Sequence, residues 1–165
     1  MDPVSARRHA AARGFTLLEV LVAVVILAVL AGLVTPMLGD GRARAVSDAG
    51  ERFVALLNQA REESVLSGRW WRLDIDPAAG VYRFAERIDG AFAPVTLEPL
   101  AGDHALAGIA VQDLAVNGEA GAGAEGIVLL PSGEQDALRV AFVAGPFRQA
   151  VVLPPFGAAR LDDAP

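Results

Sequence analysis

A single carboxylate lies inside the longest apolar run of the sequence. Between Arg13 and Asp40 the only charged residue is Glu19, and residues 15–38 are otherwise almost all apolar. A helix of about 20 apolar residues is long enough to cross a bilayer. A carboxylate inside a bilayer is costly without a partner, so intramembrane acids usually serve a function. The sequence therefore predicts a transmembrane helix that uses Glu19 to contact a partner.

Three other places could do chemistry, and each has a more ordinary interpretation. Asp74 and Asp76 precede Gly80 but lack the further ligands of a calcium loop, so we expect solvent-facing acids at a hairpin turn. His104 could be a general base, but a lone histidine in a loop is more often a solvated surface residue. Ser132 lies in a Pro-Ser-Gly turn and not in a nucleophile elbow. We therefore predict no enzymatic activity, no cofactor and no bound metal.

Trp70 and Trp71 are adjacent aromatic residues that could stack on a ligand. Consecutive side chains on a strand point to opposite faces of the sheet. We therefore expect one indole in the core and the other on the surface, where it could contact another subunit.

A second helical segment is predicted over residues 45–67. Its apolar positions recur at spacings of three and four residues, which places them on one face of a helix. That face consists of Phe53, Leu56, Leu57, Ala60 and Ser64. Gly68 is suited to end the helix. The apolar face must be buried, and the strands that follow are the obvious partner.

Pro36 lies near the end of the apolar run and should kink the first helix, because proline removes a backbone donor and clashes with the preceding turn. Gly39 and Gly41 add further freedom. We therefore expect a stiff membrane half and an amphipathic half, joined by a flexible joint at residues 39–41.

From residue 69 onward the hydrophobic period changes to two. Residues 71–76 and 81–85 alternate around a Pro-Ala-Ala-Gly turn, which predicts a β-hairpin. Further strands are predicted at 93–97, 106–116, 126–130, 138–142 and 150–153, with a Gly/Ala-rich surface loop at 117–126. A long helix followed by short strands predicts an α+β fold with an antiparallel β-sheet packed on the helix.

Composition excludes several classes of protein. The 165 residues support one modest domain besides the apolar helix, and the absence of cysteine rules out disulfides and thiolate chemistry. All 14 basic residues are arginine. Loss of residues 1–14 would leave 19 acids and 11 arginines, a net charge of −8. Such a charge is unfavourable for nucleic-acid binding, so we expect no nucleic-acid partner.

The N-terminus is open to two simpler interpretations. One is an ordinary secretory signal cleaved before Gly32, which would release a soluble enzyme or binding domain. The second is an uncleaved signal anchor. Glu19 inside the apolar run argues against the secretory signal, as does the continuation of that run to Leu38. The flanking arginines favour a cytoplasmic N-terminus by a small margin.

The residues from Arg13 to Val20 (Arg-Gly-Phe-Thr-Leu-Leu-Glu-Val) resemble the class III signal of type IV pilins and type II secretion pseudopilins. The resemblance implies that prepilin peptidase cleaves after Gly14 and that the new N-terminal residue, Phe15, is N-methylated. It also implies that Glu19 guides assembly by meeting the amine of Phe15 on a neighbouring subunit. Pro36 falls where helices of this family often carry a proline.

The rest of the chain resembles the protein H family of minor pseudopilins, GspH/FimT. The similar stretches are the helix end at residues 57–65, with Arg-Glu-Glu-Ser, and the final strand at residues 157–161. The major pseudopilin family carries a calcium loop near its C-terminus, and no comparable acidic cluster precedes Asp162 here. The pilin-like fold that the resemblance implies is a long N-terminal helix on an antiparallel sheet.

This resemblance implies a leader at residues 1–14, a transmembrane helix at 15–38 and a periplasmic domain at 39–165, with its strands within 69–161. The protein would be a single-pass inner-membrane subunit of the type II secretion pseudopilus, active in tip or initiation assembly. Its expected partners are other minor pseudopilins, the major pseudopilin, prepilin peptidase, the inner-membrane secretion platform and membrane lipid. A minor pilin of a type IV pilus, linked to pilus priming or DNA uptake, is the alternative.

Overall fold

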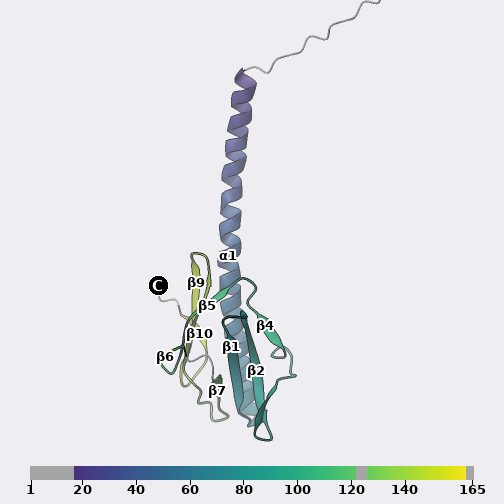
Figure 1. The fold of residues 1–165 in the computed structure, drawn as a ribbon, viewed down its shortest axis with the longest axis vertical. Coiled ribbons are helices and arrows are strands. Elements are labelled where there is room, and N and C mark those ends of the chain that lie inside the picture. The colour runs from purple at the N-terminus through teal and green to yellow at the C-terminus, as the bar shows by residue number, and fades with distance from the viewer. Residues whose placement is uncertain (1–16, 122–125, 163–165) are drawn as a thin grey trace, which may run out of the picture. The chain divides into compact units, whose positions relative to one another are not determined.

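The computed structural model describes residues 17–121 and 126–162, without the side chains of residues 29–40 (Figure 1). The chain divides into two units between Gly39 and Asp40, and each is considered by itself. The predicted processing residues Gly14 and Phe15 lie outside the described residues. Pro36 lies inside a helix, but its side chain is outside the described part.

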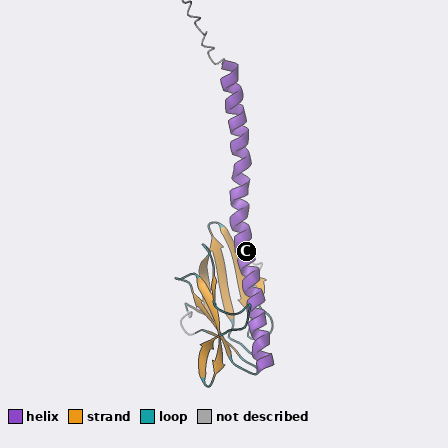
Figure 2. Cartoon of the chain, turned by 90° about the vertical axis from the view of Figure 1, so that its right-hand side faces the viewer, coloured by secondary structure: helices purple, strands orange, loops and turns teal. Residues whose placement is uncertain are grey.

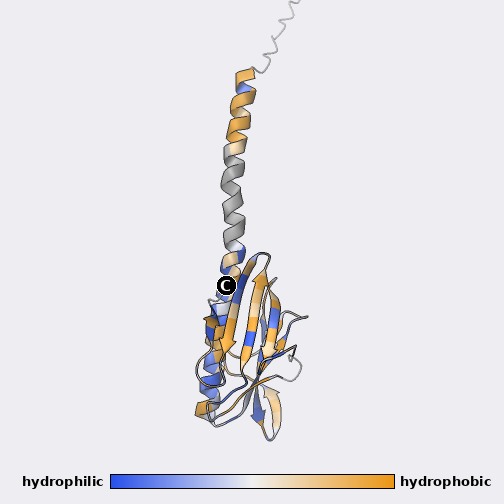
Figure 3. Cartoon of the chain, turned by 90° about the vertical axis from the view of Figure 1, so that its left-hand side faces the viewer, coloured by the Kyte–Doolittle hydropathy of each residue, from blue (hydrophilic) through white to orange (hydrophobic). Residues whose placement is uncertain are grey.

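The first element, α1 (Leu17–Ser67), is one helix of 51 residues. It continues through Pro36 and residues 39–41, so the helix ends predicted at Leu38 and Ala45 are not observed. Its described N-terminal residues are strongly apolar (Figure 3). Within the residues whose side chains are described, no helical segment is both long and apolar enough to cross a membrane. The predicted span at residues 15–38 extends into residues whose side chains are not described.

Within residues 68–121 and 126–162, ten strands follow the helix and form two antiparallel sheets. The first sheet has the order β3-β2-β1-β7, with β4 also paired to β2. Its strands are β1 (Trp71–Asp76), β2 (Val81–Ile88), β3 (Ala91–Pro94), β4 (Asp103–Ala105) and β7 (Ile127–Leu129). The second sheet has the order β10-β9-β8-β5-β6. Its strands are β5 (Ala110–Val116), β6 (Glu119–Ala120), β8 (Leu138–Ala144), β9 (Phe147–Leu153) and β10 (Arg160–Asp162). The predicted α+β fold is therefore confirmed, with two sheets where one was expected.

Both sheets pack against the part of α1 that belongs to the second unit (Figures 1 and 2). Phe53 of α1 contacts both sheets, so it joins the three layers formed by the helix and the two sheets. Its buried ring lies edge-on to Tyr82 of β2 and to Phe142 of β8, with centroid distances of 4.9 and 5.2 Å. The predicted apolar face of the helix is confirmed. Its buried members are Phe53, Leu56, Leu57, Ala60 and Ser64.

The predicted hairpin at residues 71–85 is confirmed as β1 and β2, which pair in register from Trp71 with Glu86 to Asp76 with Val81. The strand predicted at 106–116 begins later, at Ala110. Ala107 and Gly108, which have positive φ angles of 29° and 81°, form a turn before it. Positive φ is incompatible with an extended strand, so the pairing starts only after this turn.

The loop predicted at residues 117–126 begins with a hairpin. Asn117 and Gly118 have φ angles of 52° and 84°, and β6 pairs back onto β5 directly after them. Two successive residues of positive φ are the signature of a tight β-hairpin turn, and Asn-Gly is its strongest sequence signal. The Gly/Ala-rich composition of the segment obscured that signal in the sequence.

Tyr82 provides a pH-dependent test of this core. Burial raises its pKa to about 12, and the charge of Arg52 opposes that rise. A folded pKa above the ordinary value of 10 means that the neutral phenol is favoured in the folded state. This contribution to stability is therefore complete below pH 10 and is lost as the pH rises through 12. Tyr82 is the only tyrosine in the chain, so absorbance at 295 nm follows it alone. We expect ionisation near pH 12, and a midpoint near 10 in folded protein would contradict the buried placement.

Candidate functional site

Glu19 lies in the first turn of α1, where the partial positive charge of a helix N-terminus favours an acid. The surrounding side chains are apolar and exposed, among them Leu17, Leu18, Val20 and Leu21. A helix that exposes apolar residues all round must be covered by lipid or by other apolar helices. The structure therefore places the one acid of this segment on an apolar surface that requires a cover.

Asp74 and Asp76 have structural roles at the first hairpin. The carboxylate of Asp74 accepts hydrogen bonds from Arg72 Nε and Nη2, at 3.1 and 2.8 Å. Asp76 Oδ1 accepts the backbone N–H groups of Ala78 and Ala79, at 3.0 and 2.9 Å. The prediction that Asp76 marks the hairpin turn is therefore confirmed.

The two tryptophans divide as predicted. Trp71 is buried with 3% of its surface exposed, whereas Trp70 is 43% exposed and lies under the guanidinium of Arg87, whose Cζ is 5.0 Å from the ring centroid. Ser132 also has the predicted role in a turn, because its Oγ accepts a hydrogen bond from the backbone N–H of Glu134 at 3.3 Å. These residues therefore support the fold.

The surface position predicted for His104 is wrong. Its side chain is 7% exposed and stacks on the ring of Tyr82, with a centroid distance of 4.9 Å. Its Nε2 lies 3.3 Å from the carbonyl oxygen of Leu100. The reason is the pairing of β4 with β2, which places His104 opposite Tyr82 on the inner face of the sheet. A strand of three residues gives no periodicity that a sequence pattern could show.

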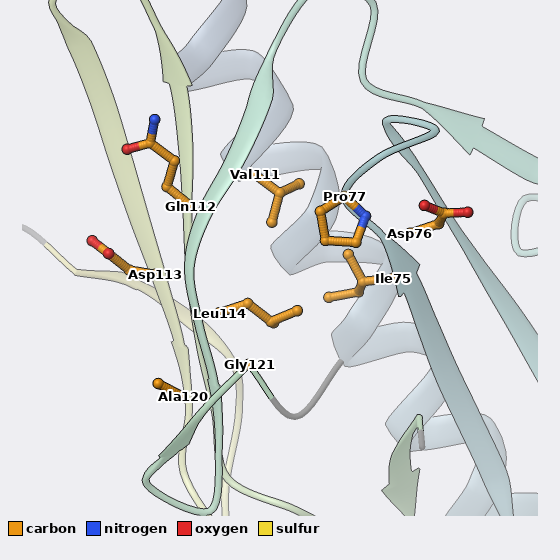
Figure 4. Close-up of a pocket in the computed structure, with 9 residues that line it drawn as sticks. All are labelled: Ile75, Asp76, Pro77, Val111, Gln112, Asp113, Leu114, Ala120 and Gly121. Carbon is orange, nitrogen blue, oxygen red and sulfur yellow. The ribbon is translucent and has the colours of Figure 1, made fainter. Parts of the chain in front are cut away.

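An open groove of about 690 Å³ lies between the end of β1 and the β5–β6 hairpin (Figure 4). Ile75 and Pro77 face Val111 and Leu114 across it, and Ala120 and Gly121 complete its lining. The carboxylates of Asp76 and Asp113 point away from this apolar centre in Figure 4. The centre of the groove is therefore apolar, with both carboxylates at its margins.

A β-bulge shapes one wall of this groove. The register of β5 against β8 shifts between Gln112 and Ala115, and Asp113 has a φ angle of 49°. The carboxylate of Asp113 pairs with Arg148 of β9. A bulge changes the direction of the side chain that follows it, and here Leu114 faces the groove. Sequence reasoning missed this surface because it depends on tertiary register and not on a local motif.

The structure brings together the two stretches that resemble the protein H family. Asn58 of α1 donates from Nδ2 to the carbonyl oxygen of Ala159 at 3.1 Å, and its Oδ1 accepts the N–H of Ala159 at 2.7 Å. Ser64 Oγ lies within hydrogen-bond distance of the carbonyl oxygens of Arg69 and Leu129, at 2.8 and 3.0 Å. The end of α1 is therefore hydrogen-bonded both to the segment before β10 and to β7.

Known solved structures share this fold. Two structures of the minor pseudopilin EpsH from the type II secretion system of Vibrio cholerae align with TM-scores of 0.61 and 0.63. The sequence identities are 18% and 17%. The alignments cover 71% and 72% of this chain and 94% and 96% of EpsH. At this level of identity the likeness shows the fold.

A curated relative is similar over a shorter region. The type II secretion system protein H of Aeromonas hydrophila is 42% identical over 71 residues. That region is 42% of this chain and 38% of the relative, so the match spans well under half of the relative's length.

Family models match both parts of the chain. Residues 10–35 match the prokaryotic N-terminal methylation motif, which includes Gly14, Phe15 and Glu19. Residues 49–155, more than half of the chain, match the model of the type II transport protein GspH. The match runs from the amphipathic part of α1 to the segment after β9, through both sheets. The chain therefore belongs to the GspH family of type II transport proteins.

Proposed function

We propose that this chain is a minor pseudopilin, a structural subunit of the type II secretion pseudopilus without enzymatic activity. The observation that carries the proposal is the presence, in one chain, of an N-terminal methylation motif at residues 10–35 and a GspH domain at residues 49–155. The exposed apolar side chains around Glu19 support a role in which this part of α1 is covered on assembly.

In this proposal the chain is made with a leader at residues 1–14 and enters the inner membrane through residues 15–38. Prepilin peptidase cleaves after Gly14, and Phe15 becomes the methylated N-terminus. Residues 39–165 then lie in the periplasm. The subunit joins other minor pseudopilins and the major pseudopilin near the tip, where it helps to initiate assembly on the secretion platform.

The test is export in a strain that lacks the gene. Enzymes normally secreted by the type II route are assayed in the culture supernatant and in the periplasm, with and without the wild-type gene on a plasmid. We expect loss from the supernatant, accumulation in the periplasm and full restoration by the plasmid. Unchanged export would overturn the proposal. In that event, loss of surface pili or of DNA uptake in the same strain would support a minor pilin of a type IV pilus.

A further inference from the structure

Arg42 is an exposed arginine beside a turn at one end of the second unit. A Cβ atom built on Gly145, in the turn between β8 and β9, would lie 3.6 Å from Nη1 of Arg42. None of the salt bridges between residues whose side chains are described includes Arg42. Arg44 is also exposed and adds a second positive charge to the same part of α1. The guanidinium of Arg42 is therefore accessible to a partner.

The β1–β2 turn and the β4–β5 turn lie at the same end of the unit. The N–H of Leu106 donates to the carbonyl oxygen of Gly80 at 2.8 Å, and Ala110 pairs with Val143 next to the β8–β9 turn. The carboxylate of Asp76, just before the first turn, accepts two N–H groups of that turn. No charged residue occurs in the three turns, which are residues 77–80, 106–109 and 144–147. The turns themselves therefore offer no charge that would repel an anion.

The position of Arg42 in the sequence brings it close to the predicted membrane span. Arg42 comes four positions after Leu38, where the apolar run ends. Four residues rise about 6 Å in a helix, and even a fully extended chain covers at most about 14 Å. The headgroup layer on each side of a bilayer is about 5–8 Å thick. Arg42 therefore lies in or next to the headgroup layer when residues 15–38 span the bilayer.

Phospholipid headgroups offer the chemistry that a guanidinium recognises. The planar guanidinium binds a phosphate group through two parallel hydrogen bonds. Anionic lipids also attract arginines that lie near the membrane surface. A protein partner would have to bring an acid to this point, whereas the short connection to Leu38 already places lipid there. The observations therefore favour lipid as the occupant.

We propose that Arg42 and the three uncharged turns form a docking surface for anionic phospholipid headgroups, with Arg42 binding a lipid phosphate. The proposal rests on the proposed function only for the membrane span at residues 15–38. Docking holds the second unit against the bilayer before the subunit joins a filament.

A fluorescent label on the docking surface would test this proposal. The chain has no cysteine, so a single introduced cysteine takes the label at one site. Pro146→Cys places a bimane label in the exposed turn beside Gly145, and Ser132→Cys places it in the exposed turn after β7 as a control. The full chain is inserted into nanodiscs of phosphatidylcholine, with or without phosphatidylglycerol. Phosphatidylcholine with a nitroxide on its headgroup is the quencher in both.

We expect phosphatidylglycerol to increase quenching at residue 146 but not at residue 132. In the anionic nanodiscs, Arg42→Gln should lower the ratio of docked to undocked protein about fivefold. Arg52→Gln is the matched control, because this exposed arginine lies ten positions further along α1. That is about 15 Å along the helix, beyond the Debye length at physiological salt. Arg52→Gln should therefore leave the quenching unchanged.

Equal quenching at residue 146 in the two kinds of nanodisc would overturn the proposal, as would an unchanged response in Arg42→Gln. Arg42 is exposed, so its substitution should leave the fold intact, and tryptophan fluorescence of the variant would verify this. A chain that does not enter nanodiscs would contradict both the membrane span and this proposal. An inserted chain that does not respond to phosphatidylglycerol would contradict this proposal alone, and export in the deletion strain tests the proposed function separately.

Discussion

Replacement of Phe53 with alanine is expected to lower the free energy of unfolding of the second unit by about 3–5 kcal/mol. Phe53 is fully buried, and its ring contacts Tyr82 in one sheet and Phe142 in the other. Its removal would leave a cavity where the helix and both sheets meet. Urea unfolding of the full chain in detergent, followed by tryptophan fluorescence, would measure the loss.

Phe156→Ala is the matched control, because it removes the same ring from a position that is 66% exposed. That change should cost less than about 1 kcal/mol, as exposed positions usually do. Equal losses for the two variants would mean that Phe53 does not join the three layers of the core.

Glu19→Ala is expected to leave the protein in the membrane and cleaved after Gly14, but to lower export at least tenfold. The carboxylate is proposed to pair with the N-terminal amine of Phe15 on a neighbouring subunit, in a medium of low dielectric constant. Removal of one partner from such a pair leaves an uncompensated charge and costs about 3–5 kcal/mol. The size of the protein in the membrane fraction would report processing, and enzyme in the supernatant would report assembly.

Val22→Ala is the control for that experiment, since it changes an exposed apolar residue within one turn of Glu19 without removing charge. Its export should remain near the wild-type level. Normal export by Glu19→Ala would contradict the assembly role of the carboxylate. Failure of processing in Glu19→Ala would instead place the role of Glu19 in recognition by the peptidase.

Features encoded by local periodicity could be predicted from the sequence. The buried face of α1 from Phe53 to Ser64 follows from helical spacing, and the opposite positions of Trp70 and Trp71 follow from strand alternation. The N-terminal motif around Glu19 could be recognised because a single acid in an apolar run is chemically unusual. Each of these signals depends on neighbours within a few residues along the chain.

Features that depend on pairing between distant strands could not be predicted in this way. The alternation in residues 138–142 predicts a strand but does not say which sheet it joins. His104 is buried only because β4 lies against β2, and Leu114 faces the groove only because a bulge shifts β5 against β8.

The two hydrogen bonds between the side chain of Asn58 and the backbone of Ala159 have a consequence for biosynthesis. The two residues are 101 positions apart in the sequence. At a synthesis rate of about 5–20 residues per second, the amide of Asn58 waits roughly 5–20 s for its partner. These hydrogen bonds therefore cannot form until synthesis has passed Ala159. A product that stops before Ala159 would lack both hydrogen-bond partners of the Asn58 amide.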